Sequence, residues 1–102
     1  MHVISQSALS KFWKKYPDAE TSLRSWYKLA TTAERSNLAE VKAVFSSADK
    51  VGHFTVFNIR GNNYRLITFI DYQYRPNFFF IRSVLTHEED DEDKWKKDQW
   101  YE

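Results

Sequence analysis

The spacing of apolar residues changes from a helical period to a strand period near residue 50. Before that point, apolar side chains recur every three or four positions, which predicts helices that bury one face. From residue 54 onward, runs of β-branched and aromatic residues alternate with short turns, which predicts strands. Helices followed by strands favour an α+β fold class, in which N-terminal helices pack on one face of a small, mainly antiparallel sheet.

Two N-terminal helices are expected to form an antiparallel hairpin. The first begins after a cap at Ser5 or Ser7, and its apolar positions are Ala8, Leu9, Phe12, Trp13 and Tyr16. Pro17 ends this helix and opens the second, whose buried stripe is Leu23, Trp26, Tyr27 and Ala30. A third, short helix is expected after a cap at Ser36 and Asn37, with the apolar positions Leu38, Val41 and Val44. Residues 1–4 can form an edge strand.

Strands are expected over residues 54–59, 64–72 and 78–85. Gly61-Asn62-Asn63 joins the first two, because these residues tolerate the positive φ of a tight hairpin turn. Tyr74-Arg75-Pro76-Asn77 supplies the second turn. Connections this short predict an antiparallel meander.

Composition limits the class of protein. A chain of 102 residues is expected to fold as a single domain over residues 1–102. It has no cysteine, which excludes disulfides and thiolate metal sites and favours a cytoplasmic location. No apolar stretch reaches the roughly 18 residues of a membrane span, and no signal-peptide segment is visible.

Charge is distributed unevenly along the chain. Residues 42–87 carry six Lys or Arg against two Asp or Glu, whereas residues 88–102 carry three against eight. The predicted strand region is therefore basic, which suits nucleic acid as a partner, and a solvated charged surface is the alternative. The acidic segment at 88–102 is expected to form a short C-terminal helix, because its acids precede its bases, or a frayed tail.

Arginines within the strand sequence are the first candidates for function. A guanidinium is always charged and binds phosphate through two parallel hydrogen bonds. Arg65 directly follows the first turn and is the main candidate, with pairing to Asp71 or to an acid of the C-terminal segment as the alternative. Arg60 is expected to flank the same surface and to contact RNA backbone.

Arg82 and His87 stand at the end of the third expected strand. Arg82 follows the apolar run 78–81, where a charge must be paired or must emerge from the core, and Asp71 is the alternative partner. His87 is the best candidate for proton transfer, because imidazole titrates near neutral pH, and a surface histidine that caps a terminal helix is the alternative. The two residues are an odd number of positions apart, so they share a face only if the strand ends or bulges near Thr86.

No metal or other cofactor is expected. His2, His53 and His87 do not fall at metal-ligand spacing, and no HExxH-type or carboxylate cluster accompanies them. The chain also lacks a phosphate-binding loop and any Ser-His-Asp or Cys-His arrangement for nucleophilic catalysis.

Four segments carry a resemblance to a known family: Met1-His-Val-Ile-Ser5, Lys42-Ala-Val-Phe45, Phe57-Asn-Ile-Arg-Gly-Asn-Asn-Tyr-Arg-Leu-Ile67 and Ile81-Arg-Ser-Val-Leu-Thr-His87. In this order they resemble the HigB toxins of type II toxin–antitoxin modules, within the RelE-like superfamily. The resemblance implies a compact α+β ribonuclease that cleaves mRNA, usually on the translating ribosome. It also implies a helix-turn-helix, HigA-like antitoxin, with DNA bound only through the toxin–antitoxin complex that represses its own operon.

The resemblance also implies residue roles. Arg65 matches the arginine after the hairpin turn in RelE-like toxins, and His87 falls near their second cationic residue. In an attack of a ribose 2′-OH on the neighbouring phosphate, Arg65 and Arg82 would stabilise charge and His87 would transfer protons. The RNA-binding residues would be Lys42, Asn58, Arg60 and Asn62. Asp90 stands where family members commonly have a Tyr.

Two other functions are kept open. A non-catalytic RNA-binding or ribosome-binding module on the same scaffold would show strong salt dependence without cleaved transcripts. A small interaction protein could instead dock a basic partner through its acidic C-terminal segment, or fold that segment back over its own basic sheet.

Overall fold

The computed structural model describes residues 2–4, 6–32, 41, 43, 45, 48–61, 63–71 and 78–88. Several expectations lie outside the described residues: the cap and two apolar positions of the third helix, the turn at 74–77, the acidic segment from residue 89 on, Lys42 and Asn62. Val41 and Ala43, which are described, are helical. In the part of the chain that the structure describes, no helix is long and apolar enough to cross a membrane.

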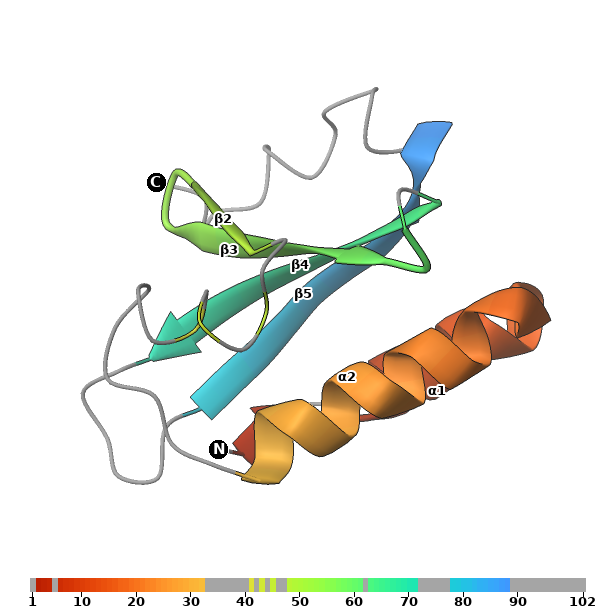
Figure 1. Cartoon of the computed structure of the whole chain (residues 1–102), viewed down its shortest axis with the longest axis horizontal. Helices are drawn as coiled ribbons and strands as arrows, with labels where there is room; N and C mark the ends of the chain where they lie inside the picture. Colours follow the sequence, from red (N-terminus) through yellow and green to blue (C-terminus); the bar gives the residue numbers. More distant parts are fainter. Residues whose placement is uncertain are drawn as a thin grey trace.

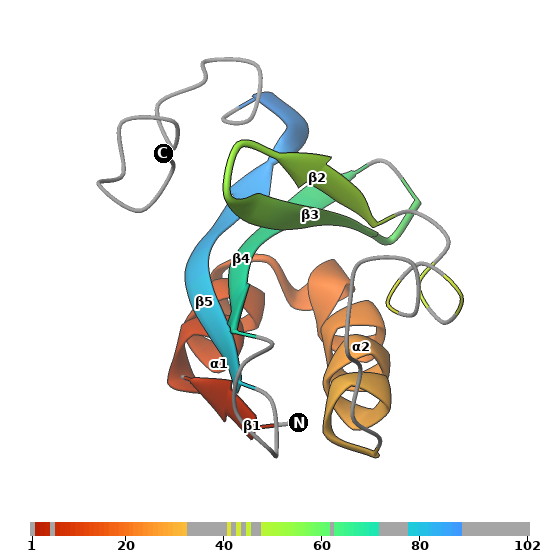
Figure 2. The same cartoon turned by 90° about the vertical axis from the view of Figure 1, so that its left-hand side faces the viewer.

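One twisted sheet occupies one side of the molecule (Figure 1). Its described strands are β1 (His2–Ile4), β2 (Asp49–Val51), β3 (Phe54–Ile59), β4 (Tyr64–Asp71) and β5 (Phe78–Thr86), in the order β1-β5-β4-β3-β2 (Figure 2). β2, β3, β4 and β5 pair antiparallel, and β1 is the parallel edge strand beside β5. The predicted meander and edge strand are therefore confirmed. β2 was not predicted, because three residues that include Asp49 and Lys50 carry no apolar alternation.

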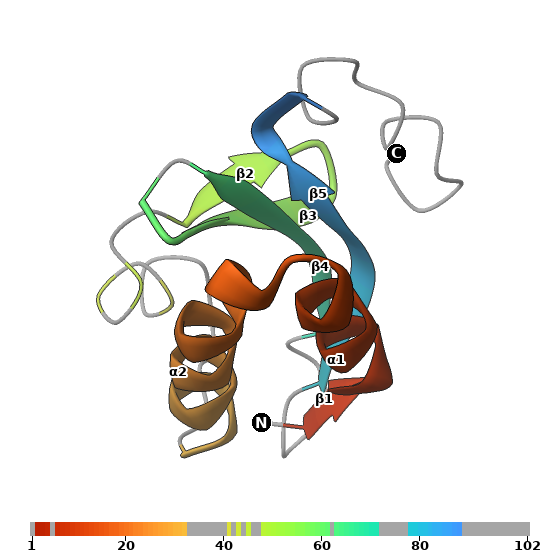
Figure 3. The same cartoon turned by 90° about the vertical axis from the view of Figure 1, so that its right-hand side faces the viewer.

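Two helices cover one face of this sheet (Figures 1 and 3). α1 (Gln6–Lys15) and α2 (Glu20–Thr32) run in opposite directions, and the short 3-10 helix η1 (Pro17–Ala19) joins them. Pro17 separates the helices as predicted, since proline breaks α1 and is tolerated at the start of the next turn. The structure thus confirms the α+β class with both helices on one face.

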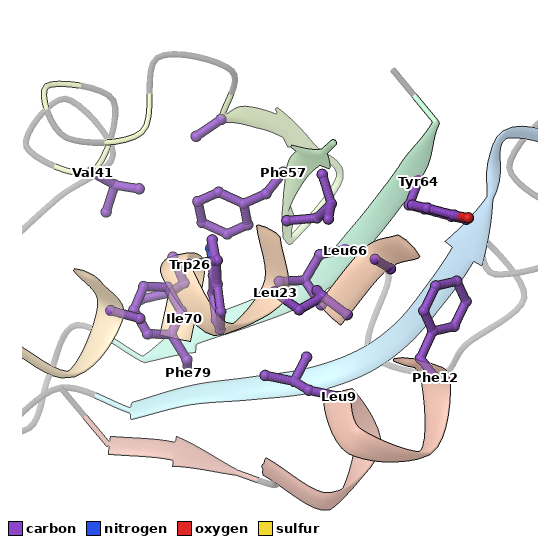
Figure 4. Packing of buried hydrophobic residues seen from close by; sticks show 14 residues of the cluster. Leu9, Phe12, Leu23, Trp26, Val41, Phe57, Tyr64, Leu66, Ile70 and Phe79 are labelled. Carbon is purple, nitrogen blue, oxygen red and sulfur yellow. The ribbon is translucent and has the colours of Figure 1, made fainter. Parts of the chain in front are cut away.

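The main core lies between the helices and the sheet (Figure 4). At one end the Trp26 ring is 5.4 Å from both Phe57 and Phe79, measured between ring centroids. At the other end the Phe12 and Tyr64 rings meet edge to face at 5.2 Å. Because these aromatic contacts join α1 and α2 to three different strands, they fix the position of the sheet on the helices.

Alternate side chains of β4 point to the two faces of the sheet. Tyr64, Leu66 and Ile70 belong to the main core under the helices. Ile67 points the other way and joins a smaller cluster with Phe54 and Val56. We call these the helix-side face and the outer face. The alternation that predicts a strand therefore also places Arg65 on the outer face, between Tyr64 and Leu66.

Candidate functional site

The β3–β4 turn and the end of β5 meet at one corner of the sheet. Tyr64 pairs with Thr86 at the last position of the β4–β5 ladder. The backbone N–H of His87 then donates to the carbonyl of Asn63 at 3.1 Å, and the N–H of Asn63 donates to the carbonyl of Arg60 at 3.2 Å. These hydrogen bonds hold the start of β4 beside the residue that follows β5.

Arg65 and His87 are in contact at this corner. The Arg65 Nη2 atom lies 3.4 Å from Nδ1 of His87, and Nη1 donates to the Tyr64 carbonyl at 3.3 Å. Because a guanidinium has only donors, Nδ1 of the imidazole is the acceptor in this contact. The Arg65 side chain is half-buried and His87 is exposed. The structure therefore brings a fixed cation and a titratable ring together at the surface.

Asn58 extends this group across the sheet. It lies directly opposite Arg65 in the β3–β4 register, so the two Cβ atoms are neighbours on the same face at about 5 Å. Asn58 is half-buried. A carboxamide beside a guanidinium can both donate and accept a hydrogen bond, which suits contact with a phosphate or a ribose.

Arg82 lies in a β-bulge. The β4–β5 register shifts so that Ile67 faces Ser83 while Thr68 faces Ile81, which leaves Arg82 as the extra residue between them. β5 ends at Thr86, which is one of the two conditions named for Arg82 and His87 to share a face, and the strand also bulges at Arg82. Arg82 is about 10 Å along β5 from the residue opposite Arg65, at roughly 3.3 Å per residue. The register places Asp71 opposite Phe78, four positions from Arg82.

Arg60 points toward the helices, where it meets a carboxylate from η1. Its Nη1 atom lies 3.1 Å from Oδ2 of Asp18, and both side chains are about half exposed, at 48% and 47%. The Tyr64 hydroxyl donates to the other oxygen of Asp18 at 2.5 Å. This bond, together with burial, raises the pKa of the Tyr64 phenol above its ordinary value. Asp18 is not recognisable as a candidate from the sequence, because an acid after Pro17 is typical of any helix start.

The positive φ expected in the turn is confirmed at Gly61, and it extends to Arg60, for which it was not predicted. Positive φ occurs at Arg60 (51°) and Gly61 (62°), whereas Asn63 does not adopt it. A non-glycine residue in this region is uncommon and costs roughly 1 kcal/mol or more. The ion pair with Asp18 supplies a physical reason why arginine holds that conformation here.

The other candidates give less information. Lys42 and Asn62 lie outside the described residues, so their predicted contacts with RNA stay predictions. Among the described residues, no group of three or more His, Cys, Asp or Glu side chains could hold a metal ion.

Comparisons with known proteins identify the family of the chain. The model of the HigB toxin family, described as the RelE-like toxic component of a toxin–antitoxin system, matches residues 19–93. The chain is 32% identical over 94 residues to the mRNA interferase toxin HigB of Escherichia coli K12, covering 89% of this chain and 88% of that protein. It is 28% identical over 94 residues to the mRNA interferase HigB of Escherichia coli O6:H1, covering 89% of each chain. The chain therefore belongs to the HigB family of RelE-like toxins.

Proposed function

We propose that this toxin cleaves mRNA through attack of a ribose 2′-OH on the adjacent phosphate, without a metal ion, as one domain over residues 1–102. The toxin role and the cleavage of mRNA rest on the family and on the relatives' names. The observation that carries the mechanism is the Arg65–His87 contact at the corner of the outer face.

The reaction needs a base for the 2′ proton, cations for the developing dianionic phosphorane, and an acid for the departing 5′-oxygen. Arg65 stabilises the phosphorane, since its guanidinium keeps its charge and can give two parallel hydrogen bonds. When a phosphate takes these donors, the contact between Nη2 and Nδ1 is released. Nδ1 of His87 then accepts a proton from the attacking hydroxyl, next to the reacting phosphate, and the departing 5′-oxygen takes its proton from water.

The surrounding polar residues position the RNA. Asn58 lies beside Arg65 and contacts the same nucleotide. Arg82, farther along β5, acts as a second cation on a neighbouring phosphate. Lys42 and Asn62 complete the proposed set of RNA contacts, whereas the guanidinium of Arg60 is held by Asp18 and takes no part in it.

The toxin acts together with an antitoxin. A toxin–antitoxin system pairs a toxin with an antitoxin, and we propose a HigA-like antitoxin with a helix-turn-helix. The complex of the two, and not the toxin alone, binds operator DNA. The reaction takes place in the cytoplasm on mRNA held by the translating ribosome.

The direct test is Arg65→Ala in a purified system of ribosomes carrying mRNA. Removal of one well-placed cation is expected to lower the single-turnover cleavage rate by about 10²–10³-fold. Lys50→Ala, which removes an exposed cation from the edge strand β2, is the matched control and should keep the wild-type rate. Cleavage should leave a 2′,3′-cyclic phosphate and a 5′-hydroxyl, and should stop when the attacking 2′-OH is replaced by hydrogen.

Two outcomes would contradict the proposal. Wild-type cleavage by Arg65→Ala would remove Arg65 from the mechanism. Growth arrest without new 5′ ends in cellular mRNA would favour the non-catalytic binding module instead.

A further inference from the structure

One carboxylate joins the helical layer to the turn that precedes Arg65. Asp18 lies in η1, between α1 and α2, and accepts a hydrogen bond from Tyr64 and an ion pair from Arg60. Tyr64 is 46 positions away in the sequence. Figure 1 shows the β3–β4 turn and the η1 end of the helix pair on the same side of the molecule.

These two partners lie on either side of the turn. Arg60 is its first residue and has a positive φ of 51°, and Tyr64 is the first residue of β4. Asp18 therefore holds both ends of the turn with its two oxygens. Because Arg60 occupies an unfavourable backbone conformation, loss of this ion pair should let the turn relax.

The turn that Asp18 holds in place supports the candidate site through two backbone carbonyls. Tyr64 directly precedes Arg65, and the carbonyl of Tyr64 also accepts from the Arg65 guanidinium. The carbonyl of Asn63, within the turn, accepts the backbone N–H of His87. A shift of the turn would consequently move Arg65 and His87 together, although Asp18 touches neither of them.

We infer that Asp18 is a positioning residue, which fixes the β3–β4 turn so that Arg65 and His87 keep their alignment for RNA cleavage. The inference rests on the proposed function. It also assigns Arg60 a structural role: its guanidinium serves the carboxylate of Asp18 more than the RNA backbone.

The test compares Asp18→Asn with Glu20→Gln. Glu20 lies two residues on and also holds an arginine, Arg24, at 2.7 Å, but both belong to α2 and neither contacts the turn. Each variant loses one charge and one ion pair. We expect Asp18→Asn to lower the single-turnover cleavage rate by about tenfold, since misplacement by a fraction of an ångström is enough for such a loss. Glu20→Gln should keep the wild-type rate.

Binding is measured separately with a 2′-O-methyl mRNA on ribosomes, which cannot be cleaved. The dissociation constant should stay within about twofold of wild type for Asp18→Asn and Arg60→Gln, with unchanged salt dependence. The double variant should cleave no more slowly than Asp18→Asn, because Asp18→Asn already breaks the ion pair with Arg60. If Arg60 instead binds phosphate, Arg60→Gln will weaken binding and lower the salt slope by about one, which would overturn the inference.

A readout independent of activity is the imidazole of His87. Nitrogen NMR shifts of that ring should change in Asp18→Asn and remain at wild-type values in Glu20→Gln, with thermal unfolding as the check that both variants fold. Should Asp18→Asn fail to fold, Tyr64→Phe removes one of the two contacts while keeping the ring, and should slow cleavage while leaving RNA affinity unchanged.

The two proposals fail in different ways. If Arg65→Ala cleaves like wild type, the proposed function falls. If Arg65→Ala is inactive but Asp18→Asn behaves like Glu20→Gln, only the positioning role of Asp18 is wrong.

Discussion

At the start of β4, the two faces of the strand use the same backbone for opposite purposes. On the helix-side face, Leu66 is fully buried and Tyr64 is 7% exposed. On the outer face, Arg65 is half-buried and contacts an exposed histidine. Successive residues of a strand point to opposite sides, so burial of one set immobilises the backbone from which the other set projects. The comparison indicates that the precision of the candidate site comes from the packing beneath it.

The largest expected effect is a difference in stability between substitutions on the two faces of β4. Leu66→Ala should lower the free energy of unfolding by about 2–5 kcal/mol, because it opens a cavity in a close-packed core. Arg65→Ala should change it by well under 1 kcal/mol, as is usual for a substitution away from the core. Urea unfolding of both variants measures this difference. An equal loss of unfolding free energy in the two variants would mean that Arg65 is mainly structural. The contrast between the two faces would then not hold.

The next largest expected effect is on the cleavage rate and concerns His87, which contacts Arg65 on the outer face. His87→Gln should lower the cleavage rate by about 100-fold, because glutamine keeps hydrogen-bonding capacity but cannot transfer a proton. This corresponds to about 2.7 kcal/mol in the barrier, at 1.36 kcal/mol for each tenfold change. Single-turnover cleavage and thermal unfolding should be measured on the same samples. A variant with normal cleavage would leave His87 as a surface histidine.

The smallest expected effect concerns the hydrogen bond between Tyr64 and Asp18, which joins the sheet to the helical layer. A raised pKa for Tyr64 means that the folded state holds the phenolic proton more tightly than the unfolded chain does. This stabilisation is complete below the ordinary tyrosine value of 10.0 and is lost as the pH rises through the folded pKa. It is worth roughly 1 kcal/mol, because Asp18 is about half exposed.

Tyr64→Phe isolates that contribution, since it keeps the ring between Phe12 and Tyr16. The difference in unfolding free energy between wild type and Tyr64→Phe should be constant between about pH 7 and 9 and should shrink above pH 10. A difference that does not depend on pH would show that the hydroxyl does not bind a carboxylate in solution.

Local patterns were sufficient for much of the fold. β3 spans the predicted residues, β4 is confirmed over Tyr64–Asp71, and β5 runs one residue beyond its predicted end. These strands are rich in β-branched and aromatic residues and are bounded by turn residues, which are short-range signals. β2 lacked such a signal, because its pairing with β3 supplies its structure and its own three residues do not.

The candidate site was predictable only in part. The position of Arg65 after the turn and its projection away from the core follow from alternation within one strand. The bulge at Arg82 does not, because it depends on the register of β5 against β4. Asp18 was missed for the same kind of reason: its partners, Arg60 and Tyr64, belong to a distant hairpin.

The sequence by itself determined the order of the elements, the α+β class and the face on which Arg65 lies, since each depends on side-chain periodicity within a few residues. The tertiary structure alone decided that Arg65 meets His87, that Arg82 occupies a bulge, and that Arg60 binds Asp18. Such contacts depend on strand register and on the docking of helices against the sheet. Burial of the shared hydrophobic core sets both the strand register and the docking of the helices, and no local sequence pattern specifies that burial.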